Sequence, residues 1–111
     1  MNIIVKRAIL FYADKYPQVR TALLTWYAEF LKVEFRSFNE LKEVYGNASI
    51  VTTRRVIFNI KGNEYRLIVS VNFKQQAAYV IWFGTHKQYD KIDVETVEFD
   101  IRILNYKAKN L

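Results

Sequence analysis

Apolar positions in the first third of the chain recur with the spacing of α-helices. Residues 6–15 place apolar side chains three and four positions apart, which predicts one helix over that range. Pro17 interrupts the pattern and is suited to open a second helix, because its missing N–H group has no partner in a first turn. The same spacing continues over residues 19–33, so the second helix should bury a wide stripe. Residues 3–5 form a short apolar start, compatible with an edge strand or with the lead-in to the first helix.

A capping motif predicts a short third helix. Ser37 and Glu40 have the spacing of a capping box, in which each side chain accepts a hydrogen bond from the backbone N–H of the other residue. The helix should end at Gly46 and Asn47, because these residue types favour a left-handed C-terminal turn.

The hydrophobic period then changes from about 3.6 to two, as in β-strands. Residues 55–60, 65–73 and 77–86 each alternate between apolar and other side chains, and short turns join them as in an antiparallel meander. A last alternation over residues 97–103 predicts a fourth strand. The end of the chain, residues 97–111, is therefore expected to be a strand-like extension and a frayed tail.

Local details of the third strand and of the hairpin turn can also be predicted. In the third strand, Tyr79, Ile81 and Phe83 should share one face, opposite Val80, Trp82 and His86. Gly84 inside this strand indicates a bulge or a close backbone approach. In the turn before residue 65, Asn63 is the residue expected to tolerate a positive φ.

Helices followed by an antiparallel meander indicate an α+β fold, with two N-terminal helices and a short third helix packed on one face of the sheet. The length fits a single domain over residues 1–111. The other face of the sheet should carry Arg66 and Ser70, with basic turns at its rim. Such a concave basic face would suit RNA.

Composition narrows the classes of function. The chain has no cysteine and one histidine, which excludes disulfides, thiolate zinc sites and multi-histidine metal sites. No apolar run approaches the ~18 residues of a membrane span. The first charged residues follow the short apolar start, which is the wrong order for a signal peptide. We therefore expect a cytoplasmic protein that binds no membrane and uses neither metal nor cofactor.

Positive charge is concentrated in the middle of the chain. Lys and Arg number 17 against 11 Asp and Glu, a net charge of +6. Residues 49–91 contain seven of the basic and two of the acidic residues, so this segment alone carries +5. A basic surface favours a polyanionic partner. The alternative is a set of solvated Lys and Arg side chains on strand faces and turns.

Two segments of this basic region resemble the HigB toxin family. Residues 58–69 read FNIKGNEYRLIV and are similar to the central hairpin of that family. Residues 84–92 read GTHKQYDKI and are similar to the segment that follows its last core strand. The stretches 41–45 and 49–51 also fit the family, and the resemblance extends over roughly residues 4–95.

The resemblance implies both a fold and a function. HigB proteins belong to the RelE-like superfamily of small α+β toxins in type II toxin–antitoxin pairs. They are mRNA interferases, which cut mRNA, typically at the ribosome, inhibit translation and are neutralised by a helix-turn-helix antitoxin, HigA. The resemblance thus implies an endoribonuclease without a metal ion. Its partners would be mRNA, the ribosome and a HigA-like antitoxin, with operator DNA contacted only through the antitoxin.

Arg66 and His86 are the leading candidates for the chemistry. A guanidinium can contact two phosphate oxygens at once and stabilise the extra charge of the transition state. The alternative for Arg66 is a surface arginine paired with a carboxylate. His86 is the one side chain of a type that titrates near neutrality, so it can act as acid or base in forming a 2′,3′-cyclic phosphate. A lone histidine is more often a structural hydrogen-bonding residue, and the match to the family motif favours catalysis.

Tyr89 and Lys74 complete the predicted catalytic group. Tyr89 can stack on a base or hold the scissile phosphate, because single-stranded RNA is read largely by aromatic stacking. Its alternative role is packing. Lys74 can add charge at the phosphate or be solvated. Further basic residues are predicted to contact the RNA backbone or the ribosome rather than to take part in chemistry: Arg54, Arg55, Lys61, Lys87 and Lys91.

Two other functions remain open at this point. The chain could be a basic RNA-binding module without catalytic activity, or a protein-interaction domain whose charge only aids solubility. The assignment of general base and general acid also stays open.

Overall fold

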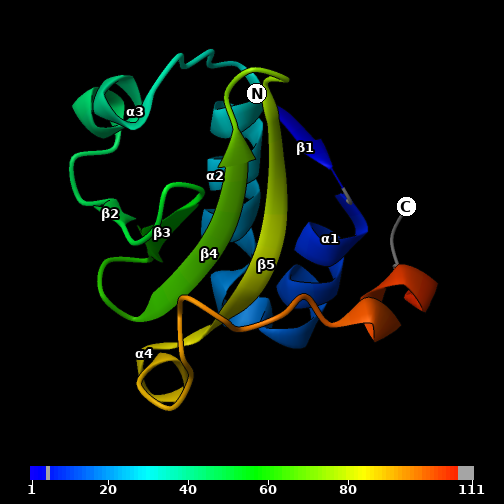
Figure 1. Ribbon diagram of the computed structural model, residues 1–111. Coiled ribbons are helices and arrows are strands. Elements are labelled where there is room, and N and C mark those ends of the chain that lie inside the picture. The colour runs from blue at the N-terminus through cyan, green and yellow to red at the C-terminus, as the bar shows by residue number, and fades with distance from the viewer. Residues whose placement is uncertain (5, 108–111) are drawn as a thin grey trace.

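The structure, a computed structural model, describes residues 1–4 and 6–107 (Figure 1). Its α-helices are α1 (Lys6–Lys15), α2 (Arg20–Leu31), α3 (Phe38–Val44) and α4 (His86–Tyr89). Two 3₁₀ helices are η1 (Pro17–Val19) and η2 (Ile101–Asn105). The strands are β1 (Asn2–Ile4), β2 (Ser49–Ile50), β3 (Arg55–Ile60), β4 (Tyr65–Asn72) and β5 (Ala77–Thr85). None of the helices in the described part of the chain has the length and apolar character needed to span a membrane.

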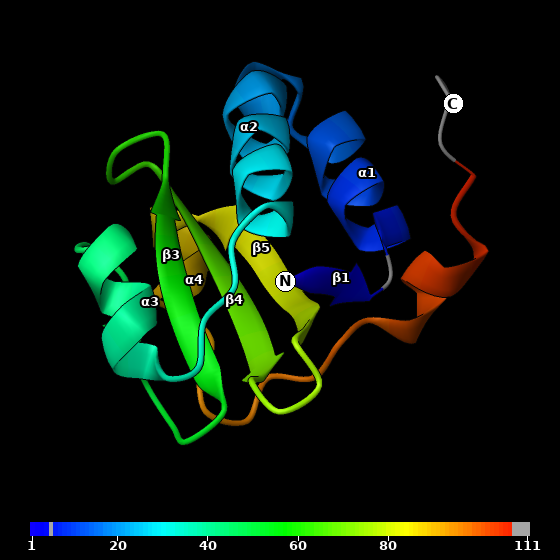
Figure 2. The same ribbon diagram turned by 90° about the horizontal axis from the view of Figure 1, so that it is seen from above.

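The five strands form one sheet in the order β1-β5-β4-β3-β2. β1 is parallel to β5, and the other neighbours are antiparallel. Helices α1 and α2 lie on one face of this sheet, and the segment after α4 runs across the opposite face (Figures 1 and 2). The predicted α+β fold is therefore confirmed. The apolar start of the chain is an edge strand through Ile4, and Val5 lies outside the described residues.

The main core lies between the helices and the sheet. It buries Leu23, Trp26 and Phe30 of α2 against Phe58 of β3. The rings of Trp26 and Phe30 stack at 4.8 Å between centroids, and Phe58 lies 5.2 Å from Trp26. From the short α3, Leu41 is buried in the same core. The large side chains that are buried here recur at the spacing of helices and strands. For this reason the sequence pattern predicted the bounds of α1, β3 and β4 to within one or two residues.

A bulge in β5 changes the predicted faces of that strand. Ile68 pairs with Trp82, but the next residue of β4, Val69, pairs with Val80, so Ile81 is an extra residue. Val80 and Phe83 both enter the core, whereas Tyr79 is 40% exposed. The prediction that Tyr79, Ile81 and Phe83 share one face is wrong, because a bulge reverses the alternation beyond it.

Two predicted left-handed turns take other forms. In the β3–β4 turn, Lys61 and Gly62 have φ of 55° and 65°, whereas Asn63 is not in the left-handed region. The backbone carbonyl of Asn63 instead accepts a hydrogen bond from Arg66 Nη1. Gly46 also lacks a positive φ, and α3 ends with the N–H of Tyr45 bonded to the carbonyl of Leu41 at 2.8 Å.

The predicted capping box of α3 is half formed. Ser37 Oγ accepts a hydrogen bond from the N–H of Glu40 at 3.3 Å, as expected. The Glu40 carboxylate, however, accepts from the N–H of Arg36 at 3.0 Å rather than from that of Ser37. Ser37 thus caps the start of the helix, and Glu40 forms a hydrogen bond with Arg36, the residue before Ser37.

The fourth strand predicted over residues 97–103 is absent. Residues 97–100 have no regular secondary structure, and η2 follows them. Asp100 begins η2 by accepting a hydrogen bond from the N–H of Arg102 at 3.1 Å. Because β1 already pairs with β5 at the near edge of the sheet, the segment packs on α1 instead, where Ile103 is 1% exposed. The frayed tail was predicted over residues 105–111; within it, Asn105 ends η2 and the Tyr106 ring packs on Phe11 of α1 with centroids 5.2 Å apart, whereas residues 108–111 lie outside the described residues.

Candidate active site

Helix α4 is attached to the end of the β3–β4 hairpin. Thr85 Oγ1 accepts a hydrogen bond from the N–H of Gln88 at 3.2 Å, and Gln88 Oε1 accepts from the N–H of Thr85 at 2.9 Å. The N–H of His86 donates to the carbonyl of Glu64 at 2.9 Å. His86 is therefore the first residue of α4 and not a strand residue as predicted. The reciprocal cap ends β5 one residue earlier and fixes His86 beside the hairpin.

Arg66 lies next to Tyr89 on the face of the sheet away from α1 and α2. Its guanidinium carbon is 5.9 Å from the centroid of the Tyr89 ring. Arg66 Nη1 donates to the carbonyls of Asn63 at 2.9 Å and Tyr65 at 3.2 Å. Among the described residues Arg66 forms no salt bridge, so it is not the carboxylate-paired surface arginine of the alternative interpretation. The two carbonyls orient Nη1 of the guanidinium. Because they are neutral groups, they do not cancel its positive charge.

A carboxylate lies beside His86. Its Nδ1 lies 3.4 Å from Asp90 Oδ2, four residues further along the chain, and both side chains are more than half exposed. A carboxylate at Nδ1 holds the imidazole in one orientation and leaves Nε2 for another partner. We therefore define the Arg66 cluster as Arg66, His86, Tyr89 and Asp90. Its members come from β4 and from the short stretch around α4.

Gly84 allows the side chains around this cluster to pack closely. It pairs with Arg66 across β4 and β5, and a Cβ atom there would lie 2.6 Å from Trp82 Cη2 and 2.7 Å from Gln88 Oε1. The predicted close approach at Gly84 is confirmed. The Trp82 ring lies over this glycine, with its centroid 6.3 Å from that of Tyr89.

A Gly84→Ala substitution should destabilise the protein by about 1–3 kcal/mol, because the added methyl group overlaps the indole and the capping amide. Urea unfolding followed by circular dichroism measures this change. Gly46→Ala is the matched control: a Cβ at Gly46 meets nothing within 4 Å, so its effect should stay within about 0.5 kcal/mol. Equal stabilities of the two variants would contradict the close approach.

The remaining predicted residues lie at different places. Lys74 is in the turn after β4, beyond Asn72, which is about 20 Å along the strand from Arg66. The structure does not bring Lys74 to the Arg66 cluster. Arg54 lies near that same far end, where it lines a depression with Tyr79. Lys61 pairs with the carboxylate of Glu64 at 3.7 Å.

Of the other three predicted RNA-binding residues, Lys87 and Lys91 lie beside the cluster and Arg55 does not. Lys87 follows His86 in α4, and both line a shallow depression beside the hairpin turn. Lys91 lies just after α4 and lines a second cavity, on the side of the cluster that faces α1. Arg55 is engaged within the protein, because its Nη1 donates to the carbonyl of Val94 at 2.9 Å.

The sheet face expected to be basic is apolar at its centre. Ile57 and Ile68 point away from α1 and α2, yet they are 5% and 0% exposed. The segment after α4 crosses this face (Figure 1), and Arg55 holds it through Val94. Arg66 lies on this face, as predicted. The Arg66 cluster lies beyond this covered centre, at the end of β4 that adjoins the β3–β4 turn.

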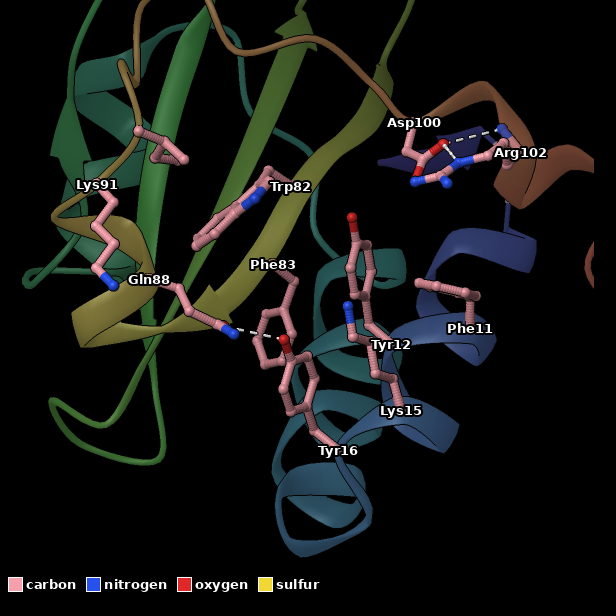
Figure 3. A pocket seen from close by; sticks show the side chains of 11 residues that line it. Phe11, Tyr12, Lys15, Tyr16, Trp82, Phe83, Gln88, Lys91, Asp100 and Arg102 are labelled. Atoms are coloured by element: carbon pink, nitrogen blue, oxygen red, sulfur yellow. Dashed lines mark hydrogen bonds and ion pairs between the residues drawn. The ribbon is translucent and has the colours of Figure 1, made fainter.

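A cavity of about 380 Å³ adjoins the cluster (Figure 3). It lies between α1, β5, the end of α4 and residues 100–102. Trp82 is shared between the two sites, since it lines the cavity and lies beside Tyr89. The other residues that line it are Phe11, Tyr12, Lys15, Tyr16, Phe83, Gln88, Lys91, Ile92, Asp100 and Arg102. Sequence reasoning identified only Lys91 among them as a functional candidate.

The polar groups of the cavity are held by neighbours. Arg102 donates to Asp100 at 2.9 Å and 2.8 Å, and these hydrogen bonds lower the pKa of the Asp100 carboxyl. Burial, with a smaller contribution from the charge of Asp100, raises the pKa of Tyr12 to about 12, so its phenol keeps its proton at neutral pH. Lys15 Nζ lies 5.5 Å from the Tyr16 ring centroid and 5.9 Å from that of Phe11.

Comparison with known proteins identifies the family. The HigB toxin model, described as the RelE-like toxic component of a toxin–antitoxin system, matches residues 19–92. The mRNA interferase toxin HigB of Escherichia coli K12 is 33% identical over 92 residues, which cover 81% of this chain and 88% of that protein. An mRNA interferase HigB of E. coli O6:H1 is 28% identical over 94 residues, covering 83% and 91%. The matched residues include the whole Arg66 cluster, and the chain belongs to the HigB toxin family.

Proposed function

We propose that this protein is an endoribonuclease that cuts mRNA, the toxin of a type II pair neutralised by a HigA-like helix-turn-helix antitoxin. One observation carries the proposal: Arg66 is oriented by two backbone carbonyls, without a carboxylate partner among the described residues, beside Tyr89 and close in the fold to the His86–Asp90 pair. Relatives in E. coli and Shigella flexneri are named mRNA interferases, which supports the assignment.

In this proposal Arg66 binds the scissile phosphate. Its Nη1 is occupied by the carbonyls of Asn63 and Tyr65, which leaves other N–H groups of the guanidinium for phosphate oxygens. Negative charge grows on those oxygens as the 2′-oxygen attacks phosphorus. A fixed cation at that position stabilises the transition state more than the ground state.

Proton transfer falls to His86. The 2′-oxygen loses a proton as it bonds to phosphorus, the bond from phosphorus to the 5′-oxygen breaks, and that oxygen gains a proton. A 2′,3′-cyclic phosphate and a 5′-hydroxyl result. His86 serves one of the two proton transfers through Nε2, while Asp90 orients the ring from Nδ1. Tyr89, whose ring faces the guanidinium, stacks on a base next to the phosphate.

Expression in bacterial cells tests the proposed role. Induction of the wild-type chain should arrest growth, and co-expression of a HigA-like helix-turn-helix antitoxin, to be sought in the adjacent reading frame, should restore it. His86→Ala should also restore growth, with soluble protein present at the wild-type level. Growth arrest that persists with His86→Ala would remove this residue from the mechanism.

A cleavage assay with purified protein addresses the chemistry. Both free mRNA and mRNA on translating ribosomes should be supplied, and the ribosome-bound mRNA should be the better substrate. Cleavage of the free mRNA should be unchanged in EDTA, because side chains alone move the protons; the ribosome reaction keeps its Mg²⁺, which the ribosome itself requires. Loss of free-mRNA cleavage in EDTA would overturn the mechanism, and RNA binding without cleavage by any form of the protein would favour a non-catalytic RNA-binding module.

A further inference from the structure

We infer that the cavity beside Trp82 binds a nucleotide of the RNA substrate, the neighbour of the nucleotide whose phosphate meets Arg66. The inference rests on the proposed endoribonuclease function and assigns its substrate a second contact site. The base would stack on Trp82, and the flanking phosphates would meet Lys15 and Lys91, which lie on opposite sides of the Trp82 side chain (Figure 3).

The lining of the cavity has the chemistry that a nucleotide requires. Its volume of about 380 Å³ lies within the roughly 300–1,000 Å³ of ligand pockets. Three cationic side chains line it against one carboxylate: Lys15, Lys91 and Arg102 against Asp100. Aromatic surface is supplied by Trp82 from β5 and by Phe11 and Tyr12 from α1. Aromatic platforms combined with cations are the usual means of holding single-stranded RNA.

The Asp100 carboxylate in the cavity should repel a phosphate less than an unpaired carboxylate would, because it is paired with Arg102. Asp100 accepts three hydrogen bonds from Arg102, one from its backbone N–H and two from its guanidinium. Lys15 adds a second cation on the α1 side, where aromatic rings hold its ammonium group. The phenol of Tyr12 keeps its proton and can donate a hydrogen bond.

The cavity is built before any ligand arrives. Tyr16 Oη donates to Gln88 Oε1 at 3.0 Å, and Gln88 is also part of the cap of α4. The floor, including Phe83 and Tyr12, belongs to the buried core. A preformed site loses little conformational entropy on binding.

The cavity is continuous with the Arg66 cluster. The centroid of Trp82 is 6.3 Å from that of Tyr89, which is 5.9 Å from the guanidinium carbon of Arg66. Neighbouring nucleotides of one strand could therefore occupy the two sites. The wall formed by residues 100–102 lies outside residues 19–92, the span that the HigB family model matches. The C-terminal segment thus adds to the cavity a wall that this model does not contain.

Titration with RNA that cannot be cleaved tests this inference. The probes are 2′-O-methyl hexanucleotides of each single base, added to ¹⁵N-labelled protein. The chain has two tryptophans, so its spectrum contains two indole N–H signals, which a Trp82→Phe variant assigns. The Trp82 signal should shift and saturate with at least one probe. The signal of Trp26, which is 5% exposed in the core, should not move.

A pair of charge variants separates the cavity from general electrostatic attraction. Lys15→Gln should weaken binding of the same probe about five- to tenfold, because it removes a phosphate contact. Lys42→Gln, an exposed residue of α3, removes the same charge far from the cavity and should change binding less than about twofold. Equal effects of the two substitutions, or a Trp82 signal that no probe moves, would overturn the inference.

The outcomes for the cavity and for the proposed function are distinguishable. If wild-type protein cleaves mRNA but no probe shifts Trp82, the cavity assignment fails and the endoribonuclease proposal stands. If wild-type protein neither cleaves nor binds RNA, the proposed function fails and this inference fails with it. The same titration is repeated with free nucleoside monophosphates in place of the hexanucleotides. Tighter binding of these than of the hexanucleotides would overturn the assignment to the RNA substrate.

Discussion

Replacing Arg66 with alanine should lower the rate of RNA cleavage by about 10²–10³-fold, the usual effect of removing one preorganised donor from a charged transition state. The protein should stay folded, because the guanidinium is bonded only to carbonyls of its own hairpin among the described residues. Single-turnover cleavage of an end-labelled mRNA measures the rate. A thermal unfolding curve checks that the variant is intact.

Lys74→Ala is the control for Arg66→Ala. Both substitutions remove one positive charge from the β4 strand or its following turn, but Lys74 lies beyond the far end of that strand. We expect cleavage by the Lys74 variant to stay within about threefold of wild type, because a distant exposed charge contributes little. A loss with Lys74→Ala as large as with Arg66→Ala would mean that charge alone, and not the position of the guanidinium, governs activity.

Truncation of Ile103 should strongly reduce the stability of the protein. Ile103 is 1% exposed and packs with the main core from the C-terminal segment. Ile103→Ala should lower the free energy of unfolding by about 2–5 kcal/mol, since it removes buried methyl groups and leaves a cavity. Urea denaturation followed by circular dichroism gives this value directly.

Ile101 provides a control of the same residue type in the same 3₁₀ helix. Its side chain is 72% exposed, so Ile101→Ala should change the free energy of unfolding by no more than about 0.5 kcal/mol. If Ile103→Ala is as mild as Ile101→Ala, the C-terminal segment is not docked on α1. The cavity beside Trp82 would then lose the wall formed by Asp100 and Arg102.

Helices and strands that bury apolar side chains at a regular spacing were predictable from the sequence. Helix α1 occupies residues 6–15 and β3 occupies residues 55–60, as the spacing of apolar positions indicated. The two-residue strand β2 has no periodicity to detect. The bulge at Ile81 also escaped prediction, because it depends on pairing with β4 rather than on residue type.

The C-terminal segment shows the limit of periodicity. Residues 97–103 alternate as a strand would, but β1 pairs with β5 at that edge of the sheet. The segment therefore buries Ile103 against α1 and leaves Ile101 in solvent. The surface on which a C-terminal segment packs depends on residues distant in sequence. The hydrophobic pattern of the segment itself therefore does not reveal that surface.

The candidate site also has a part that could be predicted from the sequence and a part that could not. Arg66, His86 and Tyr89 lie in two short motifs, so the resemblance to the HigB family was enough to single them out. The residues of the cavity come from α1, β5, α4 and the C-terminal segment, and no motif links them. Apart from Lys91, which lies in the second motif, Trp82 carried a signal, as an aromatic residue on the strand face opposite Phe83.

Analysis of the RNA ends tests the central claim most directly. Purified wild-type protein is incubated with a defined mRNA, with and without translating ribosomes, and the 3′ ends of the products are identified by mass spectrometry. The mechanism through Arg66 and His86 predicts a 2′,3′-cyclic phosphate on the upstream fragment and a 5′-hydroxyl on the downstream one. Fragments that end in a 3′-hydroxyl, or intact mRNA under both conditions, would contradict it.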